Sequence, residues 1–209
     1  VSGATLLQAD ADMGDALASF YGIREGDYFG ELVVGPGDVD GDGVPDLAIG
    51  AELCSCDVGE QDSAGAVFLW WGATVRDGGT YEQTTADSAV VGEGALNFAY
   101  QPGRAGDWDG DGHADLWVEA GFENDEISWP AQASLFSGAT LSEGGRHPFY
   151  SPMTAVTASD SIHRTRRASS EADIDGDGCQ DAVVTAYPNY INADGEEETF
   201  SAIFLLRGG

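Results

Sequence analysis

Short apolar runs, each bounded by glycine or polar residues, recur along the whole chain. One set follows three aspartate-rich segments, at residues 46–50, 115–119 and 181–185. A second set begins about 15 to 20 residues later, a spacing typical of strands joined by loops, at residues 66–71, 133–136 and 201–206. Weaker runs lie at residues 89–91 and 155–157 and just before each aspartate-rich segment. The runs are rich in strand formers and the 30 glycines interrupt any long helical period, so the pattern predicts about four β-strands per unit.

Two landmarks repeat three times at nearly constant spacing. The pattern D-x-D-G-D-G-x-x-D occurs at Asp38–Asp46, Asp107–Asp115 and Asp173–Asp181, with first aspartates 69 and 66 residues apart. A Gly-Ala-Thr segment, at Gly3, Gly72 and Gly138, precedes each of these by 35 residues. Such spacing predicts a single domain, 1–209, of three repeats, approximately 3–71, 72–137 and 138–209. Four short antiparallel strands per repeat form the blade of a β-propeller, so the predicted fold class is all-β with three blades per chain.

The charge of the chain excludes several classes of function. There are 37 acidic residues against eight basic ones, all arginine, and the formal net charge is -29. This argues against a nucleic-acid partner, because phosphate binding needs a basic surface. The lack of lysine excludes Schiff-base chemistry and a P-loop, which need a primary amine. No apolar run approaches the roughly 18 residues of a membrane span, and we expect none in this chain.

The three acidic segments carry the strongest chemical signal. Carboxylates at positions 1, 3, 5 and 9, with the backbone carbonyl of position 7, provide the oxygen ligands that Ca²⁺ prefers, and glycines at positions 4 and 6 allow the tight turns around an ion. The expected ligands are Asp38, Asp40, Asp42, Val44 and Asp46 in the first loop, Asp107, Asp109, Asp111, His113 and Asp115 in the second, and Asp173, Asp175, Asp177, Cys179 and Asp181 in the third. We therefore expect three structural Ca²⁺ ions per chain. Solvated Asp-Gly turns are the alternative.

The acidic segments are not EF-hands. An EF-hand needs a bidentate glutamate at position 12 and flanking helices. Position 12 is occupied here by Ile49, Val118 and Val184, in the middle of apolar runs. The pattern therefore predicts calcium loops between β-strands.

Three stretches of the first unit carry a further signature, Tyr28–Gly30, Gly37–Ala51 and Gly65–Gly72. Together they resemble the FG-GAP repeat of integrin α-subunit β-propellers and their bacterial relatives. All three units match in the acidic loop and the strand after it, although the second unit has Phe98-Ala99 where Phe-Gly is expected. The resemblance implies that the calcium loop joins the first two strands of a blade on one face. It also implies that ligands approach the opposite face.

Catalysis has little support in the sequence. His147 and His163 lack a neighbouring nucleophile motif, and His113 lies inside an acidic loop. The Cys54-Ser-Cys56 segment lacks the further ligands of a zinc site, so a loop thiol pair, reduced or bridged, is the simpler interpretation. We expect a binding protein and no enzyme activity.

The resemblance places ligand recognition in the loops after the second strand of each blade, residues 52–64, 121–132 and 187–199. The candidate ligand-binding residues there are the aromatics Phe122, Trp129, Tyr187 and Tyr190. The alternative is that these aromatics pack between blades. Arg164, Arg166 and Arg167 form a basic cluster in a loop predicted on the same face. The expected function is cell adhesion or protein-ligand binding; the alternatives are a lectin and, less favoured, a polysaccharide-processing enzyme.

Three blades are too few for a closed ring, because propellers typically need four to eight. The sequence opens with the end of an outer strand that lacks a blade, and closes with a blade that lacks an outer strand. We therefore expect a homodimer whose two chains form a six-bladed ring, located outside the cell or at its surface. The alternative is that these three blades are part of a longer chain.

Overall fold

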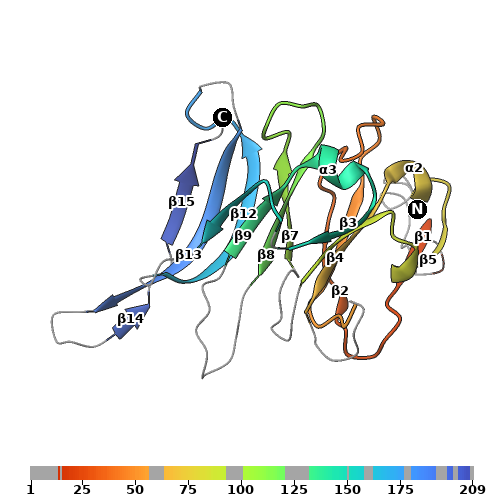
Figure 1. Ribbon diagram of the computed structural model, residues 1–209, viewed down its shortest axis with the longest axis horizontal. Helices are drawn as coiled ribbons and strands as arrows, with labels where there is room; N and C mark the ends of the chain where they lie inside the picture. The colour runs from red at the N-terminus through yellow and green to blue at the C-terminus, as the bar shows by residue number, and fades with distance from the viewer. Residues whose placement is uncertain are drawn as a thin grey trace.

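The computed structural model of the 209-residue chain is shown in Figure 1. It describes residue 14 and residues 16–56, 64–92, 101–120, 132–149, 151–157, 162–176, 180–191, 197–199 and 202–207, with backbone only for 156–157, 162–171, 186–191 and 197–199. The described chain is dominated by β-strands, and its helices are single turns. The predicted all-β class is therefore confirmed.

The first sheet contains four antiparallel strands in chain order. They are β2 (Phe29–Val34), β3 (Leu47–Ala51), β4 (Ala66–Trp70) and β6 (Ser88–Val91). Each strand pairs with the next along the chain. A fifth strand, β10 (Gly145–Pro148), is added parallel to β6 from the following repeat.

The second sheet repeats the four-stranded antiparallel order, and the third repeats most of it. The second sheet comprises β7 (Gln101–Gly106), β8 (Asp115–Ala120), β9 (Gln132–Phe136) and β11 (Thr154–Thr157). The third comprises β12 (Ile162–Ala172), β13 (Asp181–Ile191) and β15 (Ala202–Leu206), with β14 (Glu197–Thr199) on the far end of β13. Strands lie in all the predicted apolar runs.

Short elements that the sequence pattern did not predict connect these sheets. Strand β1 (Ala18–Tyr21) pairs in parallel with β5 (Gly79–Glu82). The one-turn helices α2 (Gly72–Val75) and α3 (Gly138–Ser142) start at the glycines of two Gly-Ala-Thr segments, and a 3₁₀ turn, η2 (Gln83–Thr85), follows β5. None of the described helices is long or apolar enough to cross a membrane.

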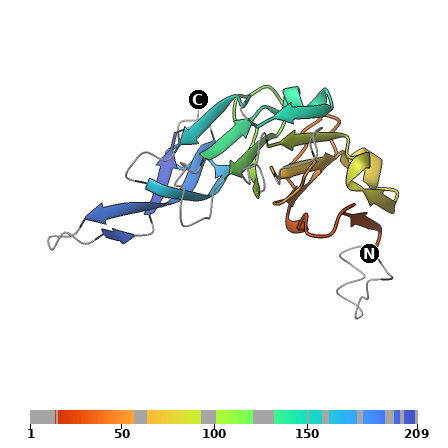
Figure 2. The same cartoon turned by 60° about the horizontal axis from the view of Figure 1, so that its bottom comes forward.

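The three sheets stand side by side in chain order, with β1 at one end of the array and β15 at the other (Figure 1, Figure 2). Leu69 of the first sheet and Val118 of the second belong to one buried cluster, and Leu135 of the second and Val184 of the third belong to another. A third cluster covers the outer face of the first sheet, beneath β1. The first strands of the sheets also meet, since β7 packs against both β2 and β12. The middle strands are thereby buried on both faces, which explains their uninterrupted apolar runs.

One predicted loop is wrong. Residues 187–199 were expected to form a loop after the second strand of the third unit, but β13 extends to Ile191 and β14 pairs with its end. The strand continues through Pro188, which pairs with Ile162 beside a β-bulge, where the ladder tolerates a missing N–H. The arginines Arg164, Arg166 and Arg167 likewise lie within β12 and not in a loop.

Candidate metal centres in three acidic loops

The acidic loops all lie at the same end of their sheets. They join β2 to β3, β7 to β8 and β12 to β13. The first two loops are also joined to each other, because the Ala114 N–H donates to the Asp38 carbonyl at 2.7 Å. The His113 ring adds a second link, with Nδ1 lying 2.9 Å from the Val39 carbonyl oxygen. The sequence predicted only a backbone role for His113, and this contact between repeats was missed.

The aspartate at position 9 organises each loop. In the first loop Asp46 Oδ2 accepts hydrogen bonds from the backbone N–H groups of Val39 and Asp40, at 2.7 and 3.3 Å. Asp115 Oδ2 accepts from Trp108 at 2.8 Å in the second loop. In the third loop, Asp181 Oδ2 accepts from residues 174 and 175 at 2.7 and 3.1 Å. All three carboxylates are buried, so a primary role of position 9 is to hold the start of the loop against the start of the following strand.

The other oxygen of this aspartate reaches the Gly-Ala-Thr segment. Asp46 Oδ1 accepts from the Gly72 N–H at 2.7 Å, and Asp115 Oδ1 accepts from the Gly138 N–H at 2.8 Å. Only glycine fits at these two places, because a Cβ at Gly72 would overlap the backbone carbonyl oxygen of Pro45, and a Cβ at Gly138 would overlap that of Ala114. This contact gives the recurrent glycine of the sequence a physical role, which its spacing alone did not show.

In each loop three aspartates bring carboxylate oxygens close together, and position 9 is one of the three in the second and third loops. One carboxylate oxygen from each of three aspartates lies within 4.8 Å of the others. The groups are Asp38, Asp40 and Asp42; Asp107, Asp109 and Asp115; and Asp173, Asp175 and Asp181. Backbone N–H groups fix the aspartates at position 1, since Gly43 donates to Asp38 Oδ2 at 2.8 Å and Gly112 donates to Asp107 Oδ2 at 3.0 Å.

The second oxygens of Asp38 and Asp107 have no hydrogen-bond partner. Asp38 Oδ1 and Asp107 Oδ1 are both buried, and no donor reaches either atom. A buried carboxylate oxygen without a donor is costly, and a cation can satisfy it. The two atoms belong to equivalent positions of two loops, so the residues present fit a hard cation that takes oxygen ligands.

The expected ligand sets are only partly visible in the structure. Asp111 accepts from the His113 N–H at 2.9 Å, as Asp42 accepts from Val44 at 2.7 Å, which shapes the second half of each loop. Asp177 and Cys179 of the third loop lie outside the described residues. An arginine side chain forms an ion pair with the third loop. The Arg207 Nε lies 2.7 Å from Asp175 Oδ2.

Burial and mutual repulsion raise the pKa of several loop carboxyls. Burial raises the pKa of Asp115 to about 6, from 3.8, and the charges of Asp109 and Asp111 contribute to the rise. Burial likewise raises the pKa of Asp40 and of Asp46. The hydrogen bond to the Val39 carbonyl is the main cause of the raised pKa of His113. A bound divalent cation would oppose the shifts of the carboxyls, because it favours their charged form.

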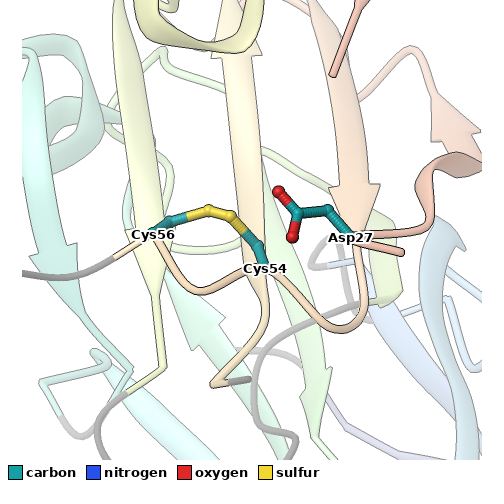
Figure 3. Close-up of side chains that lie close together, drawn as sticks. All are labelled: Asp27, Cys54 and Cys56. Carbon is teal, nitrogen blue, oxygen red and sulfur yellow. A yellow bond between two sulfur atoms is a disulfide. The ribbon is translucent and has the colours of Figure 1, made fainter. Parts of the chain in front are cut away.

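A second group of polar side chains lies at the opposite end of the first sheet (Figure 3). Cys54 and Cys56 form a disulfide in the connection after β3, so the structure selects the bridged form of this pair. The Gln83 amide Nε2 lies 3.7 Å from each sulfur. The Asp27 carboxyl is buried beside them, and this burial raises its pKa. Because the two sulfurs are bonded to each other, they close a short turn and do not offer thiolates to a metal.

The side chains of the predicted ligand-binding aromatics lie outside the described part of the chain, so these residues stay a prediction. Phe122 and Trp129 lie outside it, and Tyr187 and Tyr190 lie in β13, where only the backbone is described. A small cavity of about 140 Å³ does lie beside the disulfide. It is lined by Ile23, Arg24, Ser55, Cys56, Phe68, Gln83, Thr84 and Arg146. Two of the chain's eight arginines thus lie at the end of the first sheet opposite its acidic loop.

Comparison with known proteins adds no relative. The chain matches no family model and no curated protein.

We predict opposite pH dependences for the calcium-free and the calcium-loaded protein. Without calcium, the free energy of unfolding should fall as pH rises from about 4 to about 6, because Asp115 ionises near pH 3.8 when unfolded and only near 6 when folded. In millimolar calcium it should rise over the same interval, because ionised carboxylates bind the cation. Urea unfolding at each pH measures both curves. Parallel curves would contradict a cation in the loops.

Proposed function

We propose that this protein is a calcium-binding β-propeller module of the FG-GAP type, acting outside the cell or at its surface. Each acidic loop would hold one Ca²⁺, giving three ions per chain. The observation that carries the proposal is the pair of buried, unpartnered carboxylate oxygens at Asp38 and Asp107. They recur at equivalent positions of separate loops and are fixed by equivalent backbone donors. Solvated turns would leave such oxygens facing water.

The cation would have a structural role. The ligands we assign are the aspartates at positions 1, 3, 5 and 9 of each loop, with the carbonyls of Val44, His113 and Cys179. Each loop joins two neighbouring strands, and its ninth position also joins the following Gly-Ala-Thr segment in the first two repeats. Three Ca²⁺ ions would change the formal charge from -29 to -23, since each adds two charges. The cation would stabilise the junction of sheet, loop and next repeat by removing the repulsion among its carboxylates.

We propose ligand recognition, in adhesion or protein binding, at the end of the sheets opposite the acidic loops. The cavity beside the disulfide supports this position, because Arg24 and Arg146 line it together with the polar groups of Ser55 and Gln83. Two guanidinium groups in so acidic a protein suit a carboxylate of a ligand. A lectin that binds acidic sugars is the alternative that the same chemistry allows, and a polysaccharide-processing enzyme is the less favoured one.

We also propose that two copies of the chain associate as a homodimer and complete a six-bladed ring. The packing of β7 against both β2 and β12 supports this arrangement. These are the first strands of the three sheets, and the first strands of propeller blades surround a common axis. Two sets of three sheets would then share one axis.

Replacing one loop aspartate should destabilise the protein only when calcium is present. If Asp109→Ala weakens its site about a hundredfold, saturating calcium stabilises the variant by about 2.7 kcal/mol less than the wild type, and Tm falls by about 5 to 10 °C. In calcium-free buffer Tm should be almost unchanged. Differential scanning calorimetry in both buffers measures the two differences.

The matched control is Asp77→Ala, which removes an exposed acidic residue outside the loops. It should leave Tm unchanged in both buffers. An equal fall for Asp109→Ala with and without calcium would contradict the calcium site.

Binding of acidic probes tests the ligand site. We expect an oligoglutamate peptide to bind the wild-type protein in millimolar calcium. The double variant Arg24→Gln/Arg146→Gln should bind the peptide at least about tenfold more weakly. The reason is that a charge-assisted hydrogen bond contributes about 1.5 to 3 kcal/mol. Arg76→Gln, an exposed arginine outside the cavity, is the control. Fluorescence anisotropy measures the affinity. Binding of oligogalacturonate and not of the peptide would favour the lectin, and binding of neither would contradict this ligand site.

A further inference from the structure

Strand β15 exposes apolar side chains at positions that are buried in the first two sheets. Ile203, Phe204 and Leu205 are 74%, 39% and 49% exposed. In all three repeats a glycine lies two residues after this strand, and it aligns β15 with β4 and β9. By this alignment the residues equivalent to Ile203, Phe204 and Leu205 are Val67, Phe68 and Leu69 in β4 and Ala133, Ser134 and Leu135 in β9. All six are at most 2% exposed. The sequence of β15 is therefore that of an interior strand, although its surroundings are those of an edge.

An outer strand covers β4 and β9, whereas none of the described strands takes this place on β15. On β4, β6 pairs in antiparallel register, with Leu69 opposite Ser88 and Val67 opposite Val90. On β9, β11 pairs in the same way, with Leu135 opposite Thr154. Among the residues that the structure describes, β15 pairs with β13 alone. An exposed apolar edge of this kind is a template for another strand.

Strand β1 has the position of an outer strand without a sheet of its own. Ala18 of β1 pairs with Gly79, just as Ser88 of β6 pairs with Gly145 in the following repeat. Phe20 of β1 packs against Trp70 with ring centroids 5.1 Å apart. Val90, its equivalent in β6, belongs to one buried cluster with Phe136, the equivalent of Trp70 in β9. Strand β6 has β4 on its other edge, whereas β1 pairs with β5 alone in the described chain.

The exposure of β1 agrees with a missing neighbour. Tyr21 is 55% exposed, while its equivalent in β6, Val91, is 6% exposed. Within the described residues, β1 thus lacks a partner on one edge and the third sheet lacks an outer strand, and the two lie at opposite ends of the array (Figure 1).

We infer that β1 of a second copy pairs antiparallel with β15, in the register that β6 adopts on β4. Leu205 then faces Ala18 of the second copy, Phe204 faces Ser19, Ile203 faces Phe20 and Ala202 faces Tyr21. The inference rests on the proposed association of two chains, and it names the strands and the register that join them. The contact is head-to-tail, so two reciprocal pairings would close a ring of two copies. The face of β15 that carries Ile203 and Leu205 would then be buried against the partner's first sheet.

Disulfide crosslinking tests the register. Two double variants, Ser19→Cys/Phe204→Cys and Ala18→Cys/Leu205→Cys, are made in a Cys179→Ser background. Each places a cysteine of β1 directly opposite a cysteine of the partner's β15. Opposite residues in antiparallel strands alternate between wider and closer pairs, so one of the two cysteine pairs is a closer pair. Each should give a covalent dimer on a non-reducing denaturing gel after mild oxidation. The single variants and the offset pair Ser19→Cys/Ala202→Cys should remain monomeric on the same gel. Crosslinking by the offset pair alone would overturn the register.

A substitution on the exposed side of β15 tests the surface. Ile203→Glu should raise the Kd of the dimer at least about tenfold, because the variant loses the burial of this apolar side chain and places a charge in the interface. Met153→Glu, at a residue that is 41% exposed beside the second sheet, is the control and should leave Kd unchanged. Circular dichroism should be unchanged in both variants.

Sedimentation velocity separates failure of this inference from failure of the dimer. A particle of twice 21.8 kDa that forms no register-specific crosslink and is unaffected by Ile203→Glu would overturn the strand pairing and leave the dimer standing. A monomer at every concentration would overturn both. Neither result bears on calcium binding, which the Asp109→Ala comparison tests separately.

Discussion

The carboxylate at position 9 of each acidic loop is the contact on which the rest of the architecture depends. In the first two repeats it accepts backbone N–H groups from its own loop with one oxygen and the glycine of the next repeat with the other. One buried side chain thereby fixes the loop, the strand that follows it and the start of the adjacent helix. Buried carboxylates of this kind need donors on both oxygens, and the sequence provides them at a fixed place in the first two units.

The same loops concentrate negative charge, and this creates a need for a cation. The pKa of Asp115 rises to about 6 because burial and neighbouring carboxylates disfavour its charged form. Backbone donors satisfy one oxygen of Asp38 and of Asp107 and leave the other buried without a partner. A calcium ion would resolve both problems at once. Its proposed role is therefore to stabilise a junction that the protein chain has already shaped.

The sequence predicted those parts of the fold in which local pattern and burial agree. Strands β3, β4, β8 and β9 are buried on both faces and appear as apolar runs. The parallel strands β5 and β10 were missed, because a segment such as Gly145–Pro148 has no strand-like pattern and pairs only through contacts with a distant strand. For the site, spacing predicted the aspartates of the loops. It could not predict that Asp46 binds Gly72, 26 residues away, or that His113 contacts Val39 across 74 residues.

The most direct test of the account is the calcium content of the protein at equilibrium. Metal-free protein is dialysed against millimolar calcium in the presence of excess magnesium, and the bound metal is measured by atomic emission. We expect three calcium ions per 21.8 kDa chain, falling to two in Asp107→Asn. Fewer than one ion per chain, or the same content in the variant and the wild type, would contradict the account.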